Sequence, residues 1–222
     1  MTQAVIFDID GTLIDSVDLH AAAWVEALRH FGIEVAFGDM RQQIGKGGDQ
    51  LLPVFVPDER LRTEEKTISD FRSDLFKREY LPRVRPFPGV PALFQKIRSA
   101  GKTIALASSG KADEVQNYVR IAGVTELVDV TTSADDAERS KPAPDIFQAV
   151  LEKLVPIPAE QCVVIGDTPW DVVAAKRAGL RTIGVLSGGF PEAELREAGA
   201  IAIYKDPEDL FARYEESPLA QG

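Results

Sequence analysis

The chain has few of the residues from which covalent cross-links and zinc sites are built. Its 222 residues include one cysteine, Cys162, and two histidines, His20 and His30. A single cysteine cannot form an intramolecular disulfide, and so few sulfur and imidazole ligands exclude a Cys/His zinc cluster. The sequence also lacks an apolar run near the ~18 residues of a membrane span, and its start lacks the basic and apolar regions of a signal peptide. These absences predict a cytoplasmic protein.

Positive charge is also scarce. The 25 Lys and Arg residues face 35 Asp and Glu residues, which gives a formal net charge of −10. A field of this sign disfavours nucleic acid and anionic membrane surfaces as partners, because both are bound by clustered Lys and Arg. This field does not exclude an anionic small molecule as a ligand, since a metal ion and a few focused donors can reverse the sign of the potential locally. The hydrophobic content of 45% is that of an ordinary globular protein and excludes disorder.

Short β-branched runs alternate with helical stretches along most of the chain. The predicted strands are 3–8, 102–108, 162–166 and 182–186, with shorter candidates at 128–131 and 201–204. The predicted helices lie near 90–100, 111–122, 142–154 and 169–179. Near-continuous apolar strands separated by helices are typical of a parallel sheet that is covered on both faces. We therefore predict an α/β fold with a Rossmann-like core.

One long segment interrupts this alternation after the first strand. Its apolar residues recur at helical spacing and include Trp24, Leu28, Phe31, Leu61, Ile68, Phe71 and Leu75. It ends in a proline-rich linker over 81–88, and it is far longer than a crossover between parallel strands requires. The pattern predicts an all-helical insert, residues 16–82, lodged in a core formed by residues 1–15 and 83–222.

Chemically reactive side chains gather where the predicted strands end. The four clusters are Asp8-Ile9-Asp10-Gly11-Thr12, Ser108-Ser109-Gly110-Lys111, Ser140-Lys141-Pro142 and Gly166-Asp167-Thr168-Pro169-Trp170-Asp171. Open α/β sheets place their ligands at the carboxyl ends of the strands, so these clusters are expected to converge. Each one alone also has an ordinary structural explanation, such as a helix cap, a solvated lysine or a turn.

Together the clusters point to phosphoryl-transfer chemistry. Several carboxylates meeting in one crevice would repel one another unless a cation lay among them, and oxygen ligands favour Mg²⁺. A hydroxyl group, a helix N-terminus and a lysine are donors that suit a phosphoryl group. A carboxylate can then serve as the nucleophile.

These motifs, in this order and spacing, resemble the four motifs of the haloacid dehalogenase-like superfamily. The helical insert is similar to the cap of its first subclass, the group of phosphoglycolate phosphatases, sugar-phosphate phosphatases and β-phosphoglucomutase. The resemblance covers essentially the whole chain. It implies a Mg²⁺-dependent phosphatase that acts on a small phosphate monoester, of the sugar-phosphate or phosphoglycolate type, as a monomer or homodimer.

The resemblance also implies a role for each matching residue. Asp8 is the nucleophile that forms an aspartyl-phosphate, and Asp10 is the acid and base that serves the leaving oxygen and then water. The phosphoryl group is held by Ser108, Ser109 and Lys141. The metal is held by Asp8, the backbone carbonyl of Asp10 and Asp167, with Asp171 as a ligand or as support. The presence of Asp10 argues against dehalogenation, because the true dehalogenases of this fold lack that second acid.

The choice between phosphatase and mutase depends on the insert. His20 resembles a histidine that assists a substrate hydroxyl in β-phosphoglucomutase, although a lone helical histidine is as often a partly buried structural residue. Lys46 and Gly47 lie in a glycine-rich turn, which is either a surface loop or the cap loop that selects the leaving group. The mutase also needs a second phosphate clamp, commonly an arginine just after this turn, and this chain has none over 48–50. This departure favours the phosphatase.

A non-enzymatic alternative is the receiver module of two-component signalling, which also combines acidic residues, Mg²⁺, a hydroxyl and a lysine. Receivers have no helical insert, and they place the paired acids and the phosphoacceptor on different strands. The Asp8-x-Asp10 spacing and the insert therefore both disfavour this alternative.

Overall fold

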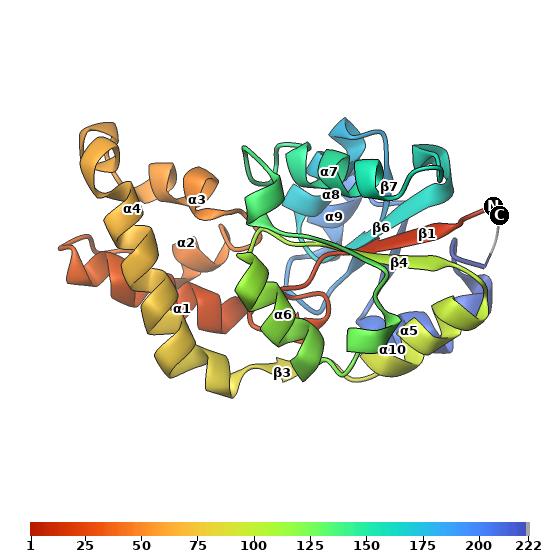
Figure 1. The fold of residues 1–222 in the computed structure, drawn as a ribbon. Coiled ribbons are helices and arrows are strands. Elements are labelled where there is room, and N and C mark those ends of the chain that lie inside the picture. Colours follow the sequence, from red (N-terminus) through yellow and green to blue (C-terminus); the bar gives the residue numbers. More distant parts are fainter. Residues whose placement is uncertain (221–222) are drawn as a thin grey trace.

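The central element of the computed structural model, which describes residues 1–220, is a six-stranded parallel sheet (Figure 1). Its strands, in spatial order, are β5 (Val130–Thr132), β4 (Thr103–Ala107), β1 (Ala4–Phe7), β6 (Cys162–Gly166), β7 (Arg181–Val185) and β8 (Ala202–Tyr204). Every neighbouring pair is parallel. The first strand thus lies in the middle of the sheet, between β4 and β6, and all four of its residues are fully buried. The predicted α/β fold is confirmed.

Helices cover both faces of the sheet, and alternate residues of β1 face opposite layers. Val5 and Phe7 pack in the core shared with α5 (Val90–Ser99), α6 (Ala112–Ile121) and α10 (Pro207–Ala212). Ala4 and Ile6 pack in the core shared with α7 (Asp145–Lys153) and α8 (Pro169–Arg177). Helix α9 (Glu192–Ala198) packs beside α8. This double burial explains the lack of polar alternation in the strands.

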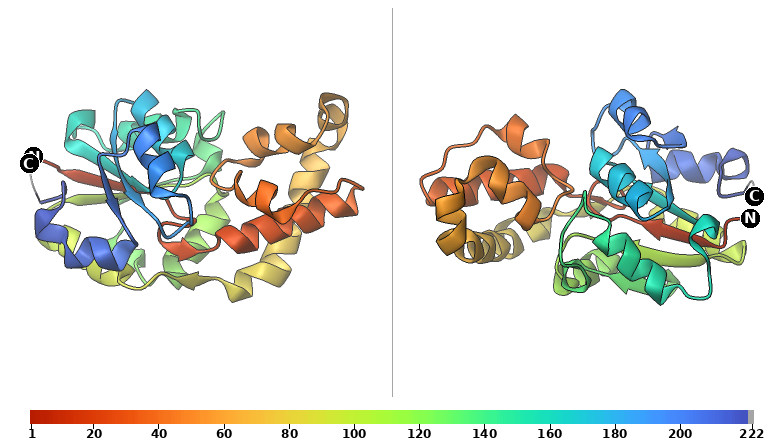
Figure 2. Two further views of the ribbon diagram at one scale, coloured as in Figure 1. Left: turned by 180° about the vertical axis from the view of Figure 1, so that it is seen from behind. Right: turned by 90° about the horizontal axis from the view of Figure 1, so that it is seen from above.

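Residues between β1 and β4 build a second group of helices at one end of the sheet. They comprise α1 (Val17–His30), α2 (Phe37–Arg41), α3 (Gly48–Phe55) and α4 (Asp58–Leu75), which continues into a π-helical turn (Phe76–Tyr80) and a 3₁₀ turn (Leu81–Arg83). These helices have an apolar core of their own, which includes Trp24, Leu28, Met40 and Ile68. Figure 2 shows this group at the end of the sheet opposite the N-terminus. We propose that it is a cap domain with the predicted limits, residues 16–82.

The two chain segments that join the cap to the core lie side by side. Strand β2 (Ile14–Asp15) pairs antiparallel with β3 (Arg85–Pro86) in a separate two-stranded ribbon. The chain therefore leaves and re-enters the core at one place, immediately after Asp8 and Asp10. The sequence did not predict this ribbon, because two-residue strands carry no periodicity.

The strands and helices predicted for the core agree with the observed ones to within two residues, with three differences. The predicted helix over 142–154 begins only at Asp145, because Pro144 disfavours the helical conformation at Ala143 before it. Helices α9 and α10 were not predicted.

Within residues 1–220 no helix combines the length and the apolarity that crossing a bilayer would take.

Candidate active site

Three carboxylates meet at the carboxyl edge of the central strands. Asp8 follows β1, Asp167 follows β6, and Asp171 lies in the first turn of α8. One oxygen from each lies within 4.8 Å of the others, and all three side chains are buried. Because β1 and β6 are parallel neighbours in register, residues that follow them reach the same edge of the sheet. The structure thus brings the first and fourth clusters together, as the sequence predicts.

Lys141 lies among these carboxylates rather than at the surface. Its side chain is 1% exposed, and its Nζ donates to Asp8 Oδ1 and, at 2.7 Å, to Asp171 Oδ1. Burial alone would lower the pKa of Lys141, but the charges of Asp171 and Asp8 outweigh it and raise that pKa. The lysine is therefore a fixed positive charge beside Asp8.

The buried carboxylates disfavour one another's ionisation despite this lysine. Burial, with the charges of Asp171 and Asp10, raises the pKa of Asp8 to about 7 against the opposing effect of Lys141. Burial and the charges of Asp8 and Asp171 likewise raise the pKa of Asp167 well above its usual range. One lysine does not neutralise three buried carboxylates, so the cluster favours a further cation.

The surroundings of Asp167 suit a bound divalent cation. Its Oδ1 accepts from Thr12 Oγ1 at 2.9 Å, whereas its buried Oδ2 has no hydrogen-bond partner among residues 1–220. Two glycines confine this oxygen. A Cβ atom would lie 2.3 Å from Oδ2 at Gly11 and 1.7 Å from it at Gly188. Carboxylate oxygens held in this way are the ligands that a hard cation prefers.

Both oxygens of Asp171 are already engaged. Oδ1 accepts from Lys141, and Oδ2 accepts from Thr168 Oγ1 at 2.6 Å and from Thr168 N at 3.1 Å. Thr168 Oγ1 in turn accepts from Asp171 N, which completes a capping box at the start of α8. Of the two roles left open by the sequence, these bonds favour support of Lys141 and of the helix start.

The side chain of Asp10 is held by partners outside the carboxylate cluster. Its Oδ1 accepts from Ser16 Oγ at 2.5 Å and lies 2.8 Å from His20 Nε2. Burial alone would raise the pKa of Asp10, but His20, Ser16 and Arg72 outweigh it and lower that pKa. The side chain of Asp10 is thus placed for proton transfer rather than for the metal, for which its backbone carbonyl remains the predicted ligand.

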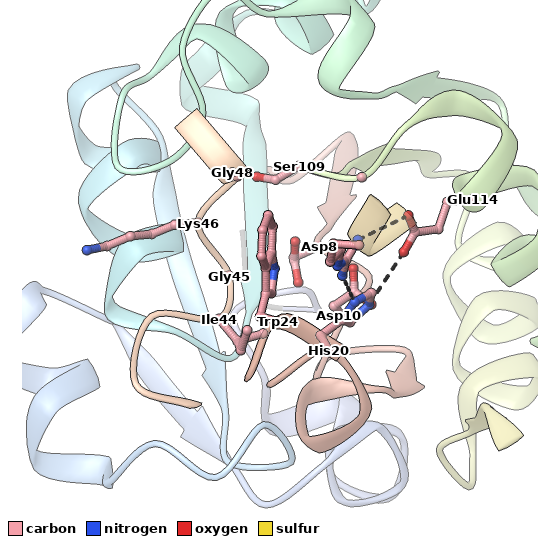
Figure 3. A pocket seen from close by; sticks show the side chains of 13 residues that line it. Asp8, Asp10, His20, Trp24, Ile44, Gly45, Lys46, Gly48, Ser109 and Glu114 are labelled. Atoms are coloured by element: carbon pink, nitrogen blue, oxygen red, sulfur yellow. Dashed lines mark hydrogen bonds and ion pairs between the residues drawn. The ribbon is translucent and has the colours of Figure 1, made fainter. Parts of the chain in front are cut away.

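A cavity of about 70 Å³ opens in front of Asp8 and Asp10 (Figure 3). Ser109 lines it, and the buried Ser109 hydroxyl has no hydrogen-bond partner among residues 1–220, which suits a donor to a phosphoryl oxygen. Ser108 is buried at the end of β4, where its Oγ accepts from Gly110 N at 3.0 Å. The Ser108 hydroxyl proton therefore remains available for a second partner.

The glycine-rich turn of the cap lies directly on the core. A Cβ atom at Gly47 would lie 2.0 Å from Ser140 Oγ, so the turn approaches the core as closely as glycine allows. Lys46 also lines the cavity, but its Nζ donates to Gln43 Oε1 at 2.6 Å and lies 4.0 Å from the ring centroid of Trp170. Figure 3 shows its side chain directed away from Asp8. In this geometry Lys46 packs on Trp170 instead of facing the leaving group.

Sequence reasoning missed three residues that line the same cavity. They are Trp24 on α1, Arg72 on α4 and Glu114 on α6. None belongs to a motif or follows a strand, and each fits the ordinary pattern of its helix. His20 was identified, and its buried contacts with Asp10 and Glu114 place it within the site.

The chain matches known proteins along most of its length. Residues 2–179 match the family model of the haloacid dehalogenase-like hydrolases. A phosphorylated carbohydrates phosphatase of Thermotoga maritima is 30% identical over 94% of this chain and 96% of its own. A hydrolase from Pseudomonas syringae has the same fold, with a TM-score of 0.87, 31% identity, and coverage of 97% of this chain and 99% of that one. The Arabidopsis thaliana protein SUPPRESSOR OF QUENCHING 1 is 33% identical over 92% of this chain, which spans a fifth of that protein (20%).

The chain belongs to the haloacid dehalogenase-like hydrolases. It is an enzyme of the phosphatase type within that family, as the sequence predicted. The receiver alternative is thereby set aside.

Proposed function

We propose that this chain is a Mg²⁺-dependent phosphatase that hydrolyses a small phosphate monoester through an aspartyl-phosphate on Asp8. The observation that carries the proposal is the arrangement around the cavity. The nucleophilic carboxylate of Asp8 lies beside a fixed lysine, and Asp8 and Asp10 line the same small cavity. The carbohydrate phosphatase among the relatives supports a phosphorylated sugar or another small monoester as the substrate.

In this proposal the metal is held by Asp8, Asp167 and the backbone carbonyl of Asp10, with Asp171 as support. When bound, Mg²⁺ supplies positive charge that offsets the carboxylates and the phosphoryl oxygens. Lys141 holds Asp171 and Asp8 in place and contributes a second positive charge near the reacting phosphorus.

The two aspartates of the first motif divide the reaction between them. An ionised oxygen of Asp8 forms the bond to phosphorus, the bond from phosphorus to the leaving oxygen breaks, and that oxygen takes a proton from Asp10. The negative charge of the bound phosphoryl group favours this proton on Asp10, whose pKa is otherwise low. In the second half, the oxygen of a water molecule bonds to phosphorus, its proton passes to Asp10, and the bond to Asp8 breaks.

The contacts of the glycine-rich turn favour a phosphatase over a phosphosugar mutase. The positions just after the turn hold Asp49 and Gln50, and Asp49 Oδ2 accepts from Ser140 N at 3.0 Å. A carboxylate at this place repels a second phosphate group instead of clamping it. The cytoplasmic location and the monomeric or homodimeric state remain predictions.

A panel of phosphate monoesters assayed with and without Mg²⁺ tests the proposal. We expect Mg²⁺-dependent release of inorganic phosphate, with small sugar phosphates among the best substrates. Asp8→Asn should abolish turnover and leave the fold intact, because the amide fills the same volume but cannot attack phosphorus. Substantial multiple-turnover activity of Asp8→Asn would contradict this assignment of the nucleophile.

A separate assay distinguishes the mutase. It supplies a hexose 1-phosphate with its bisphosphate activator and follows both inorganic phosphate and the hexose 6-phosphate. We expect inorganic phosphate to dominate. Dominant formation of the 6-phosphate, lost in His20→Ala, would establish a mutase instead.

A further inference from the structure

Four side chains beside Asp10 form a closed ring of polar contacts, and three of them belong to no motif. The ring consists of His20 on α1, Arg72 on α4, and Glu114 and Tyr118 on α6. Tyr118 Oη lies 2.9 Å from His20 Nε2 and donates to Glu114 Oε1 at 2.9 Å. Arg72 Nη1 lies 4.0 Å from Glu114 Oε2, and Arg72 Nη2 contacts His20 Nδ1, which closes the ring.

The contacts of the ring favour one tautomer of His20. Arginine has only donors, so His20 Nδ1 must accept the hydrogen bond from Arg72, and the single ring proton is on Nε2. Burial, with the charges of Asp10 and Glu114, raises the pKa of Tyr118 well above its usual range, so its hydroxyl keeps the proton that it donates to Glu114. His20 Nε2 is therefore held as a donor toward Asp10 Oδ1, at 2.8 Å, and toward Tyr118 Oη, at 2.9 Å.

This donor determines which oxygen of Asp10 faces the substrate. The hydrogen bonds that reach Asp10 from Ser16 and His20 both fall on Oδ1. The other oxygen, Oδ2, is left to exchange a proton with the leaving group. A carboxyl group is an effective acid only when the oxygen that carries its proton lies within hydrogen-bonding reach of the leaving oxygen.

The ring also crosses the boundary between cap and core. His20 and Arg72 come from the helical insert, and Glu114 and Tyr118 come from a helix that packs on the sheet. The ring is therefore complete only when the cap lies on the core, as it does here. Figure 3 shows the contact between Glu114 and His20 at the side of the cavity. His20 Nε2 lies 3.5 Å from Glu114 Oε1.

We propose that Arg72, Glu114 and Tyr118 are positioning residues that orient Asp10 through His20 and make this orientation depend on closure of the cap. The proposal rests on the phosphatase function proposed above. A neighbouring ion pair between the same two surfaces, Lys77 Nζ–Asp113 Oδ2 at 2.7 Å, also holds the cap on the core. The proposal gives Arg72 and Glu114 a role beyond this attachment.

The test compares kcat/KM for phosphate monoesters with leaving groups that range from dinitrophenol to simple alcohols. This ratio covers only the steps up to the aspartyl-phosphate, so it reports Asp10 as an acid and not as a base. In Glu114→Gln and Arg72→Lys we expect a loss of under about threefold for the dinitrophenyl ester, whose leaving group needs no proton. For alkyl esters the loss should reach roughly 10- to 100-fold, a part of the 10²–10⁴ that acid–base catalysis contributes.

Two controls separate positioning from adhesion. Asp113→Asn breaks the neighbouring ion pair, which lies outside the ring, and should change kcat/KM by less than about twofold for every ester. The double variant Arg72→Lys/Glu114→Gln should lose little more than the worse single variant, because both act through one network. Tyr118→Phe, which removes a single hydroxyl, provides the same test if either charged variant fails to fold.

Equal losses for aryl and alkyl esters in a variant that unfolds at the wild-type temperature would overturn the proposal. So would additive losses in the double variant, or losses in Asp113→Asn that match those in Glu114→Gln. These results would leave the phosphatase function intact. A wild-type enzyme that hydrolyses none of the esters would instead overturn the proposed function, and this proposal with it.

Discussion

Replacing Gly188 by alanine tests whether the position of Asp167 matters for metal binding. An alanine Cβ at this position would lie 1.7 Å from Asp167 Oδ2 and 2.5 Å from its Cγ, whereas an ordinary contact needs at least 3.4 Å. The backbone of Gly188 does not require glycine, because its φ lies outside the left-handed range. The expected effect of the substitution therefore comes from the close contact alone.

The contact can be relieved only by moving Asp167 or the loop that carries Gly188. Arg41 Nη2 donates to Gly188 O at 3.0 Å, and Ser187 Oγ donates to Gly11 O at 2.6 Å, so displacement of the loop would break bonds to the cap and to the first motif. We expect Asp167 to move by about 1 Å or more. Misplacement of this size can lower activity about 100-fold, and changes beside metal ligands typically weaken metal affinity 10- to 100-fold.

The assay measures phosphate release as a function of Mg²⁺ concentration for Gly188→Ala and for a matched control. Gly38→Ala is suitable, because a Cβ there meets nothing within 4 Å and its φ also lies outside the left-handed range. We expect a higher Mg²⁺ requirement and a lower kcat/KM for Gly188→Ala, and wild-type values for Gly38→Ala. A wild-type Mg²⁺ dependence in Gly188→Ala would refute the reasoning that Asp167 is a confined metal ligand.

Two further predictions concern the charges around Asp8. Lys141→Met leaves Asp8 and Asp171 as buried carboxylates without their shared cation, so urea unfolding in EDTA should show a loss of about 3–5 kcal/mol; wild-type stability in this variant would contradict the pairing. Burial raises the pKa of Asp8 from 3.8 to about 7, so in EDTA the folded chain keeps a proton that the unfolded chain has already lost. The free energy of unfolding should therefore fall by about 4 kcal/mol from this group as the pH rises from about 4 to about 7, and Asp8→Asn should remove most of that slope. If the free energy of unfolding changed with pH to the same extent in the wild type and in Asp8→Asn, the raised pKa of Asp8 would be ruled out.

The local signals were sufficient for the sheet and for the motif residues. The run before Asp8 and the run before Asp167 are uninterrupted apolar segments, and both form central strands buried on both faces. The direction of a parallel sheet then places whatever follows these strands at one edge, which is why the sequence could predict that Asp8 and Asp167 lie together. The short ribbon of β2 and β3 could not be predicted, since its stability comes from pairing between segments about 70 residues apart.

The sequence by itself determined the strands and the class of chemistry, and it singled out Asp8, the nucleophile proposed above, because apolar runs and strand-end residues act within a few positions of one another. Only the tertiary structure decided how the site is completed. Arg72 and Glu114 reach His20 from helices that lie 52 and 94 residues further along the chain, and each belongs to a helix whose pattern is ordinary. Gly188 likewise became informative only when folding placed it against Asp167. Such contacts depend on how whole elements pack, and packing of distant elements leaves no periodic trace in the residues that make them.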